Sequence, residues 1–438
     1  MASTRGELLA VACLCAVTLP SLTTAQAARG AQPGGHAEDR LKMVVVLSRH
    51  GVRSPTWKQD RLNGYSSLPW PQWSVTPGNL TTRGSELLKP FGSFDRAFFA
   101  RAGLFDAQGC ADGASVYIWA DTDQRTQESG RALATGLYPN CTPAVRGLRE
   151  GDNDSIFHSA SDASAADGRK AFAEFEKRVA KPPAGDTTEL LKQMQRVLLG
   201  CLPQADCTPQ RTPEIKLPDA PTAARRGKGD HLVDLQGPLP LASTFSEDLL
   251  LEYAEGMPPE SVGWGKVDEA QISRFLGLHT AYFDLMHRTP ALAKIEASNL
   301  LLHIERTLQQ AVQQKAVAGA VGNPGDKLVV RVGHDTNLAG VSELLGLHWT
   351  LDGRNDDTPP GAEFAFELWQ ASKGAYSVQV TITMQTLLQM RNLSELTFVA
   401  PPAREVLPLP GCLSDSHRCA WEDFARIAAM EGKKTEGP

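Results

Sequence analysis

Three short apolar runs stand out along the chain, and each is followed by polar or charged residues. They cover residues 42–48, 116–120 and 328–332, and the first reads KMVVVLS. Short runs rich in β-branched residues are typical of buried strands. Open α/β sheets bind their ligands just outside the carboxyl ends of the strands. We therefore expect the segments that follow the three runs to converge in space.

Between these runs, apolar residues recur at the spacing of amphipathic helices. The predicted helices cover residues 84–101, 124–137, 169–179, 189–199, 243–255, 268–288 and 290–316. Pro90 is expected to kink or divide the first helix. Residues 202–230 are rich in proline and polar residues and are predicted to form a loop. Residues 363–369 and 376–383 alternate like a pair of strands.

The order of these elements predicts an α/β protein. Residues 42–141 and 301–425 contain the predicted strands, and residues 142–300 are mainly helical by pattern. We expect an α/β sandwich domain with an inserted, mainly helical smaller domain. The chain has 438 residues, of which 42% are hydrophobic, so it is not a disordered protein. Its net charge of -6, without long runs of one sign, gives no reason to expect nucleic acid or an anionic membrane as a partner.

The N-terminus has the composition of an export signal. A basic residue precedes the mostly apolar residues 8–22, and Ala25-Gln26-Ala27 offers a small-residue cleavage site. A membrane anchor is the alternative, but a spanning helix needs about 20 apolar residues and Pro20 interrupts this stretch. We expect a signal peptide over residues 1–27 and a periplasmic or extracellular protein.

The cysteines agree with an oxidising compartment. Of the eight, Cys13 and Cys15 lie within the predicted signal, where a lipoprotein signal ending before Cys13 stays an alternative. The other six form three couples that are local in sequence: Cys110 with Cys141, Cys201 with Cys207, and Cys412 with Cys419. Six cysteines permit 15 connectivities, so their spacing leaves the pairing open. An even number after an export signal favours disulfides over a metal site.

The most specific motif follows the first apolar run, where residues 49–56 read RHGVRSPT. The planar guanidinium groups of Arg49 and Arg53 can each bind two non-bridging oxygens of a phosphate. His50, between them, is placed to attack phosphorus. Gly51 allows the backbone to turn and to approach an anion closely. The alternative is a basic loop that holds a carboxylate, and the R-H-G-x-R-x-P pattern favours the phosphate site.

A second polar segment, residues 121–126, reads DTDQRT and follows the second run. Arg125 is a candidate third cation for the phosphate, and Asp121 or Asp123 is a candidate to orient the arginines. Taken alone this evidence is weak, because an aspartate at a helix start and an exposed arginine are both common.

The third run is followed by residues 333–337, GHDTN. His334 can donate a hydrogen bond to a phosphate oxygen. Asp335 can protonate the departing alkoxide, which is general acid catalysis. The alternative is that Asp335 caps the helix expected to begin near Thr336. The position after a strand, together with the first motif, favours the acid.

In this order the three motifs resemble the histidine acid phosphatase branch of the phosphoglycerate-mutase-like superfamily, and are closest to the bacterial histidine acid phytases. The likeness runs from about residue 42 to about residue 425. Four shorter stretches also look similar: residues 78–84, 263–265, 287–290 and 357–361.

The resemblance implies the fold of that superfamily, an α/β domain with a smaller helical domain. It also implies that His50 is a nucleophile forming a phosphohistidine and that Asp335 is the proton donor. The residues that would bind the phosphate are Arg49, Arg53, Arg125 and His334. The implied disulfides are Cys110–Cys141, Cys201–Cys207 and Cys412–Cys419. The family needs no metal or other cofactor, and we expect none here.

One departure from the family bears on the substrate. Bacterial phytases of this group have a lysine directly after the P-T pair, whereas this chain has Trp57 there and Lys58 one position later. Losing a cation at the pocket rim should weaken the binding of a polyanion such as phytate. Thr56 still matches the phytases, and Glu247, Arg288 and Lys58 are candidate pocket residues. Their alternatives are a solvated surface charge or, for Arg288, a cation at a helix C-terminus.

The sequence therefore predicts an exported acid phosphatase that hydrolyses phosphate monoesters through a phosphohistidine, with phytate as the first candidate substrate. A broad-specificity acid phosphatase and a glucose-1-phosphatase are the near alternatives. A mutase or transferase and a non-catalytic phosphate-ester binding protein are the remote ones. We expect small-molecule phosphate esters as partners, no nucleic acid, no stable membrane association, and a monomer.

Overall fold

The computed structural model describes residues 39–432, apart from residues 107, 182–185, 218–219, 229–230 and 413–416. The described residues fall within one compact unit. The predicted signal peptide, residues 1–27, lies outside them. Among the described residues, no helix is both long and apolar enough to cross a membrane.

A mixed β-sheet forms the base of the fold, with strand order β11-β10-β9-β1-β6-β2-β3 and β12 paired to β10. The strands are β1 (Arg40–Arg49), β2 (Val116–Ala120), β3 (Val145–Arg146), β6 (Leu328–Gly333), β9 (Glu363–Gln370), β10 (Tyr376–Met384), β11 (Ala403–Leu407) and β12 (Cys419–Ala420). β1, β6 and β2 are parallel neighbours, so the predicted convergence of their carboxyl ends is confirmed. The predicted strand pair is also present, as the antiparallel β9 and β10.

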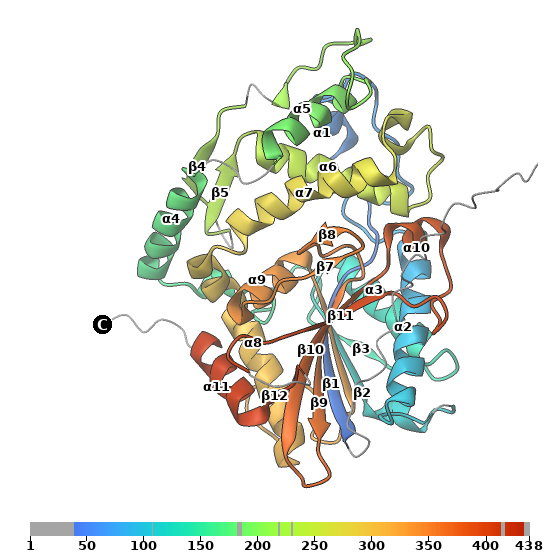
Figure 1. Ribbon diagram of the computed structural model, residues 1–438, viewed down its shortest axis with the longest axis vertical. Coiled ribbons are helices and arrows are strands. Elements are labelled where there is room, and N and C mark those ends of the chain that lie inside the picture. Colours follow the sequence, from blue (N-terminus) through green and yellow to red (C-terminus); the bar gives the residue numbers. More distant parts are fainter. Residues whose placement is uncertain are drawn as a thin grey trace, which may run out of the picture. The chain divides into compact units, whose positions relative to one another are not determined.

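Helices cover both faces of the sheet, which explains why its central strands read as continuous apolar runs. One face packs against α8 (Pro290–Gln313), α9 (Asp335–Leu345) and α11 (Trp421–Gly432). The other packs against α2 (Thr82–Arg101) and α3 (Gln124–Leu137). Figure 1 shows α2 and α3 on one side of the strands and α8 and α11 on the other. This layering confirms the predicted α/β sandwich.

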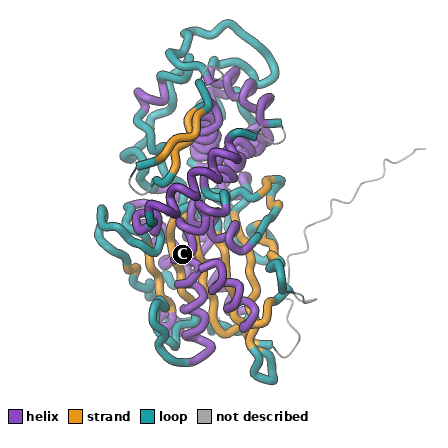
Figure 2. Tube along the Cα trace, turned by 90° about the vertical axis from the view of Figure 1, so that its left-hand side faces the viewer, coloured by secondary structure: helices purple, strands orange, loops and turns teal. Residues whose placement is uncertain are grey.

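A second group of helices gathers beyond one end of the sheet (Figures 1 and 2). It contains α4 (Ala165–Val179), α5 (Thr187–Leu198), α6 (Pro238–Ala254), α7 (Glu269–Met286) and the hairpin of β4 (Ala223–Arg226) and β5 (Val233–Gln236). Its core also includes Val52, Leu87 and Met390, which lie outside residues 142–300. The predicted domain boundaries therefore stay a prediction.

The seven predicted helices are all present, and α3 has the predicted bounds. α2 is not divided at Pro90: it continues through the proline, held along its length against α3 and the sheet. The loop predicted over residues 202–230 is wrong in part, because β4 lies within it. The sequence of β4, AARR, has no strand pattern of its own, and the strand forms through its pairing with β5. The helices α1 (Gln59–Asn63), α10 (Leu387–Asn392) and α11 were not predicted, and neither were the strands β3, β5, β11 and β12.

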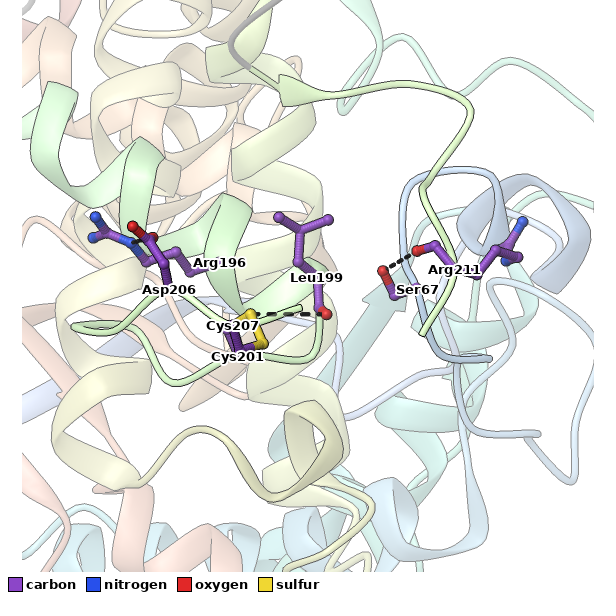
Figure 3. Close-up of a disulfide and its surroundings, with 7 residues drawn as sticks. All are labelled: Ser67, Arg196, Leu199, Cys201, Asp206, Cys207 and Arg211. Carbon is purple, nitrogen blue, oxygen red and sulfur yellow. Dashed lines mark hydrogen bonds and ion pairs between the residues drawn. A yellow bond between two sulfur atoms is a disulfide. The ribbon is translucent and has the colours of Figure 1, made fainter. Parts of the chain in front are cut away.

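Three disulfides join Cys110–Cys141, Cys201–Cys207 and Cys412–Cys419, as the family resemblance implied. Figure 3 shows the second of these at the end of α5. The loop that it closes is also held by Arg196, whose Nε donates to Asp206 Oδ1 at 2.7 Å. Nearby, the hydroxyl of Ser67 donates to the carbonyl of Arg211. These contacts fix the loop against the helices.

Candidate active site

The loop after β1 is fixed to the end of the neighbouring strand. The backbone N–H of His50 donates to the carbonyl of Gly333 at 3.0 Å. A Cβ atom at Gly51 would lie 2.8 Å from the Leu88 side chain and 3.0 Å from the Gly84 carbonyl oxygen. The predicted reason for this glycine was close approach to an anion. In the structure, its small size lets α2 pack against the loop, and the close approach to an anion stays a prediction.

The two arginines of the first motif are held by carboxylates from distant segments. Arg49 is buried, and its guanidinium donates to the Thr358 carbonyl at 2.6 Å and pairs with Asp335 Oδ2 at 2.7 Å. Glu247, on α6, forms ion pairs with both Arg49 and Arg53. Burial alone would raise the pKa of Glu247, but the two arginines hold it well below its ordinary value. Glu247 therefore stays ionised and orients both guanidinium groups.

His50 is buried with one ring nitrogen engaged. Its Nδ1 donates to the Gly51 carbonyl at 2.8 Å, so Nε2 carries the lone pair. Burial, followed by the charges of Arg49 and Arg125, lowers the pKa of His50 well below its ordinary value. The ring therefore remains neutral in acid, where an ordinary histidine would be protonated.

Asp121, at the end of β2, accepts hydrogen bonds from two histidines. His334 Nε2 and His158 Nε2 each lie 2.7 Å from its Oδ2. Although burial would raise the pKa of Asp121, the two imidazoles lower it well below its ordinary value. Asp121 was one of two candidates for orienting an arginine, and that part of the prediction is wrong, because it orients His334 instead.

Arg125, from the start of α3, is oriented by the other candidate. Its Nη2 lies 2.5 Å from Asp123 Oδ2. The same nitrogen lies 3.4 Å from His334 Nδ1, a long hydrogen bond in which the arginine donates. The third predicted cation is thus next to the predicted phosphate ligand of β6. Segments 121–126 and 333–337 form one cluster.

Asp335 is the first residue of α9, and His334 occupies the N-cap position. The backbone N–H of Thr336 donates to Asp335 Oδ1 at 2.8 Å, and Oδ2 faces Arg49. Burial raises the pKa of Asp335, but Arg49 together with His279 and His334 outweighs it, and the pKa ends below its ordinary value. In the absence of a phosphate group, Asp335 is therefore ionised.

His158 is not among the residues that the sequence predicts. It precedes the short 3-10 helix η2 (Ser159–Asp162), and its backbone N–H donates to the Asp154 carbonyl at 2.9 Å. The Asp154 carboxylate accepts from Trp119 Nε1 at 2.8 Å, and Asn337 Nδ2 donates to the Phe157 carbonyl at 3.0 Å. These contacts hold the segment that places His158 next to Asp121. A lone histidine in a loop carries no sequence pattern that could have revealed it.

The ligand atoms of Asp121, His158 and His334 lie within 4.8 Å of one another, so these residues could hold a metal ion. The sequence shows no such cluster because the three residues come from separate segments. Two imidazole N–H groups donating to one carboxylate account for the arrangement without an ion. The prediction that the site uses no metal remains a prediction.

A cavity of about 250 Å³ opens above this cluster. The predicted residues that line it are His50, Arg53, Thr56, Asp123, Arg125, His334 and Asp335. Arg49, Asp121 and Glu247 lie behind them and hold them in place. Residues outside the predicted set also line the cavity, among them His158, His231, His287 and Glu296.

Two predicted pocket residues lie elsewhere. Arg288 is buried, with Nη1 3.0 Å from Asp356 Oδ2 and its guanidinium 5.1 Å from the Trp349 ring centroid. Lys58 is exposed and is the N-cap residue of α1. Neither lines the cavity, so both predictions are wrong. Trp57 packs against Phe245 in the helical core, which turns this part of the chain away from the site.

The cluster combines cationic donors, a neutral imidazole with a free ring nitrogen, and a carboxyl group next to an arginine. Guanidinium groups bind phosphate oxygens through paired N–H donors. An imidazole nitrogen with a lone pair is a nucleophile. The arrangement can therefore bind a phosphate group, attack phosphorus and protonate a leaving oxygen.

The chain is similar to known proteins in sequence and in structure. Residues 40–383 match the model of the histidine phosphatase superfamily, branch 2. The chain is 34% identical to phytase AppA of Escherichia coli over 89% of this chain and 91% of that protein. It is 28% identical to a glucose-1-phosphatase of Salmonella typhimurium over 98% and 100%.

Among solved structures, a Hafnia alvei phytase in complex with tartrate has a TM-score of 0.81 and 33% identity, covering 91% of this chain and 98% of that chain. The phytase from Citrobacter braakii has a TM-score of 0.76 and 32% identity, covering 90% and 98%. The family match extends over most of the chain and includes every strand-end motif described above. The chain therefore belongs to the histidine phosphatase superfamily, branch 2.

Proposed function

We propose that the protein is an acid phosphatase that hydrolyses phosphate monoesters, with phytate as its main substrate. The observation that carries this proposal is the state of His50. Its Nδ1 donates to the Gly51 carbonyl, and His50 lines a cavity together with Arg53 and Arg125. A phosphate drawn to these arginines meets a neutral nucleophile.

In the first step, Nε2 of His50 attacks phosphorus and the bond to the leaving oxygen breaks. Arg53 and Arg125 line the cavity and bind the remaining phosphoryl oxygens, whose charge is spread over them in the transition state. Arg49 and His334 join them when the phosphate replaces their contacts with Asp335 and Arg125. The products of this step are a phosphohistidine and an alcohol. Splitting the hydrolysis into two easier steps is the advantage of nucleophilic catalysis.

Asp335 supplies the proton that the departing alkoxide needs. Its pairing with Arg49 lowers the pKa of its carboxyl in the empty site. A bound phosphate brings negative charge beside both groups and draws on the same arginine, so it raises that pKa towards protonation. Water then attacks the phosphohistidine, and Asp335, now ionised, accepts a proton from it.

Phytate is the preferred substrate because relatives named as phytases are the more similar ones in sequence and in structure. A glucose-1-phosphatase is the second candidate, supported by a relative that covers the whole chain at 28% identity. We also propose that the protein is exported and works as a monomer in the periplasm or outside the cell. The motivating features are the N-terminal pattern over residues 1–27 and the three disulfides.

A kinetic panel tests the proposal. Phosphate release is measured at about pH 5 from phytate, glucose 1-phosphate and p-nitrophenyl phosphate, with product analysis for rearranged esters. We expect free phosphate from all three and the highest kcat/KM on phytate. A preference for glucose 1-phosphate would favour the second candidate. A rearranged ester, or no product from any substrate, would contradict phosphatase activity.

A further inference from the structure

The cavity extends outwards from the phosphate cluster to a wall formed by the helical segments. His287 follows the last residue of α7, and Glu296 lies on α8. His231 lies two residues before β5, a strand whose residues contact α7. We call His231, His287 and Glu296 the outer wall. All three line the cavity.

Contacts on neighbouring elements fix the position of His287. Its backbone N–H donates to the Phe283 carbonyl at 2.8 Å, and its ring centroid lies 4.9 Å from that of Phe283. Its Nδ1 lies 3.0 Å from Glu296 Oε2. Because the carboxylate accepts at Nδ1, Nε2 remains for another partner.

The charged residues around the cavity show why the histidines matter for the binding of a polyanion. The lining arginines are Arg53 and Arg125, and the lining carboxylates are Asp123, Glu296 and Asp335. The carboxylates outnumber the arginines among these residues, so a second phosphate group needs further donors. The imidazole rings of His231 and His287 can supply N–H donors at the outer wall.

Among the described residues that line the cavity there is no lysine to bind a second phosphate group. Lys58, the cation nearest to the first motif, does not line the cavity. Among the described lining residues, the groups outside the phosphate cluster that can carry positive charge are His231 and His287. A polyphosphorylated substrate must place a second phosphate outside the cluster that holds the reacting one.

We propose that His231 and His287 form the subsite for a second phosphate group of the substrate, and so set the preference for polyphosphorylated over singly phosphorylated esters. This inference rests on the proposed function, because it assumes that the reacting phosphate occupies the cluster around His50. Glu296 orients His287, but its negative charge repels the second phosphate group and so lowers the affinity of the subsite.

The test compares kcat/KM for inositol hexakisphosphate and for p-nitrophenyl phosphate at about pH 5. In the double variant His231→Asn/His287→Asn, the ratio of the two values should fall about tenfold, because the hydrogen bonds from the two imidazoles to the second phosphate group are lost. Glu296→Gln should raise the ratio a few-fold, which is a change in the opposite direction. Lys58→Ala is the matched control and should leave the ratio unchanged.

An unchanged ratio in the double variant, in protein whose thermal unfolding matches the wild type, overturns the proposal. An equal fall in Lys58→Ala also overturns it, because the effect would then belong to the general charge of the protein. Should the double variant fail to fold, the two single variants and Glu296→Gln carry the test. Wild-type protein that releases phosphate from neither ester contradicts the proposed function instead. Calorimetric binding of inositol hexakisphosphate to His50→Ala, with and without the double substitution, then tests the subsite separately.

Discussion

The two ends of the cavity differ in how deeply their side chains are buried. At the strand ends, Arg49, His50 and Asp121 are buried, and each has a fixed partner at hydrogen-bond distance. On the outer wall, His231 is exposed and His287 is half-buried. Rigid, pre-oriented donors suit a reaction centre, because they need no rearrangement when charge develops. More exposed groups suit the choice between substrates. Substitutions at the strand ends should therefore lower kcat on every ester, whereas substitutions on the outer wall should change the preference between substrates.

The largest effect is expected at the centre of the strand-end cluster. His50→Ala removes the proposed nucleophile and should lower kcat about 10⁴-fold or more on every ester, because no second group can take over its role. Phosphate release from phytate and from p-nitrophenyl phosphate measures this loss. Retained binding of inorganic phosphate shows that the site is intact. Substantial turnover of either ester by His50→Ala would contradict the claim that the chemical step depends on the strand-end cluster.

Asp335→Asn should separate substrates by their leaving groups. Inositol and sugar alkoxides need a proton, whereas nitrophenolate leaves readily without one. Loss of a general acid costs about 10²–10⁴-fold where protonation is needed. We expect kcat/KM to fall by that factor on phytate and far less on p-nitrophenyl phosphate. An equal loss on both substrates would mean that Asp335 only orients Arg49.

His158 contacts the strand-end cluster from a segment outside the strand-end motifs, and its substitution tests how far that cluster extends. His158→Ala removes one of the two hydrogen bonds that hold the Asp121 carboxylate, and kcat/KM on p-nitrophenyl phosphate should fall about tenfold. His158→Gln, which keeps an N–H donor, should restore most of the activity. His231→Ala is the control on the outer wall and should not change this value. If Gln fails to rescue, His158 acts through packing alone.

The smallest effect is expected at Asp95 and Glu363, near the sheet. Their pKa values are raised, whereas that of Asp121 is lowered. Glu363 pairs with Ser48 across β9 and β1, and it lies next to Asp95 of α2. Burial raises the pKa of Asp95 to about 7, and burial with the neighbouring Asp95 raises the pKa of Glu363 well above its ordinary value.

Such groups stabilise the fold fully below their unfolded pKa near 4, and that contribution is lost as the pH rises through their folded pKa values. The titration of this pair therefore lowers the melting temperature as the pH rises from about 4.5 to about 7.5. Glu363→Gln should reduce this fall by about 1–3 °C. An identical fall in both proteins would show that the pair does not titrate in this range.

The sequence predicted the strand-end cluster well because its residues lie within short motifs. Arg49, His50 and Arg53 share one loop, and His334 and Asp335 are adjacent. Parallel pairing of β1, β6 and β2 then brings the motifs together. The three apolar runs in the sequence predict these strands. The fold class was predictable for the same reason.

The outer wall could not be predicted in this way. His231 and His287 are single residues in separate segments, and only the packing of α7 and β5 above the sheet brings them to one cavity. Conversely, Arg288 looked like a pocket residue by its charge, but an ion pair with Asp356 and the face of Trp349 account for it. Charge alone does not show which side of a helix end a residue occupies.

The most direct test of the central claim is to trap the covalent intermediate. Wild-type protein is mixed with a ³²P-labelled ester, quenched within one turnover and digested, and the labelled peptide is sequenced. A phosphohistidine is labile in acid and stable in base, so the digestion is carried out in alkali. The account predicts such an adduct on His50, and none in His50→Ala. Label on an aspartate or a serine, or turnover without any covalent label, would contradict it.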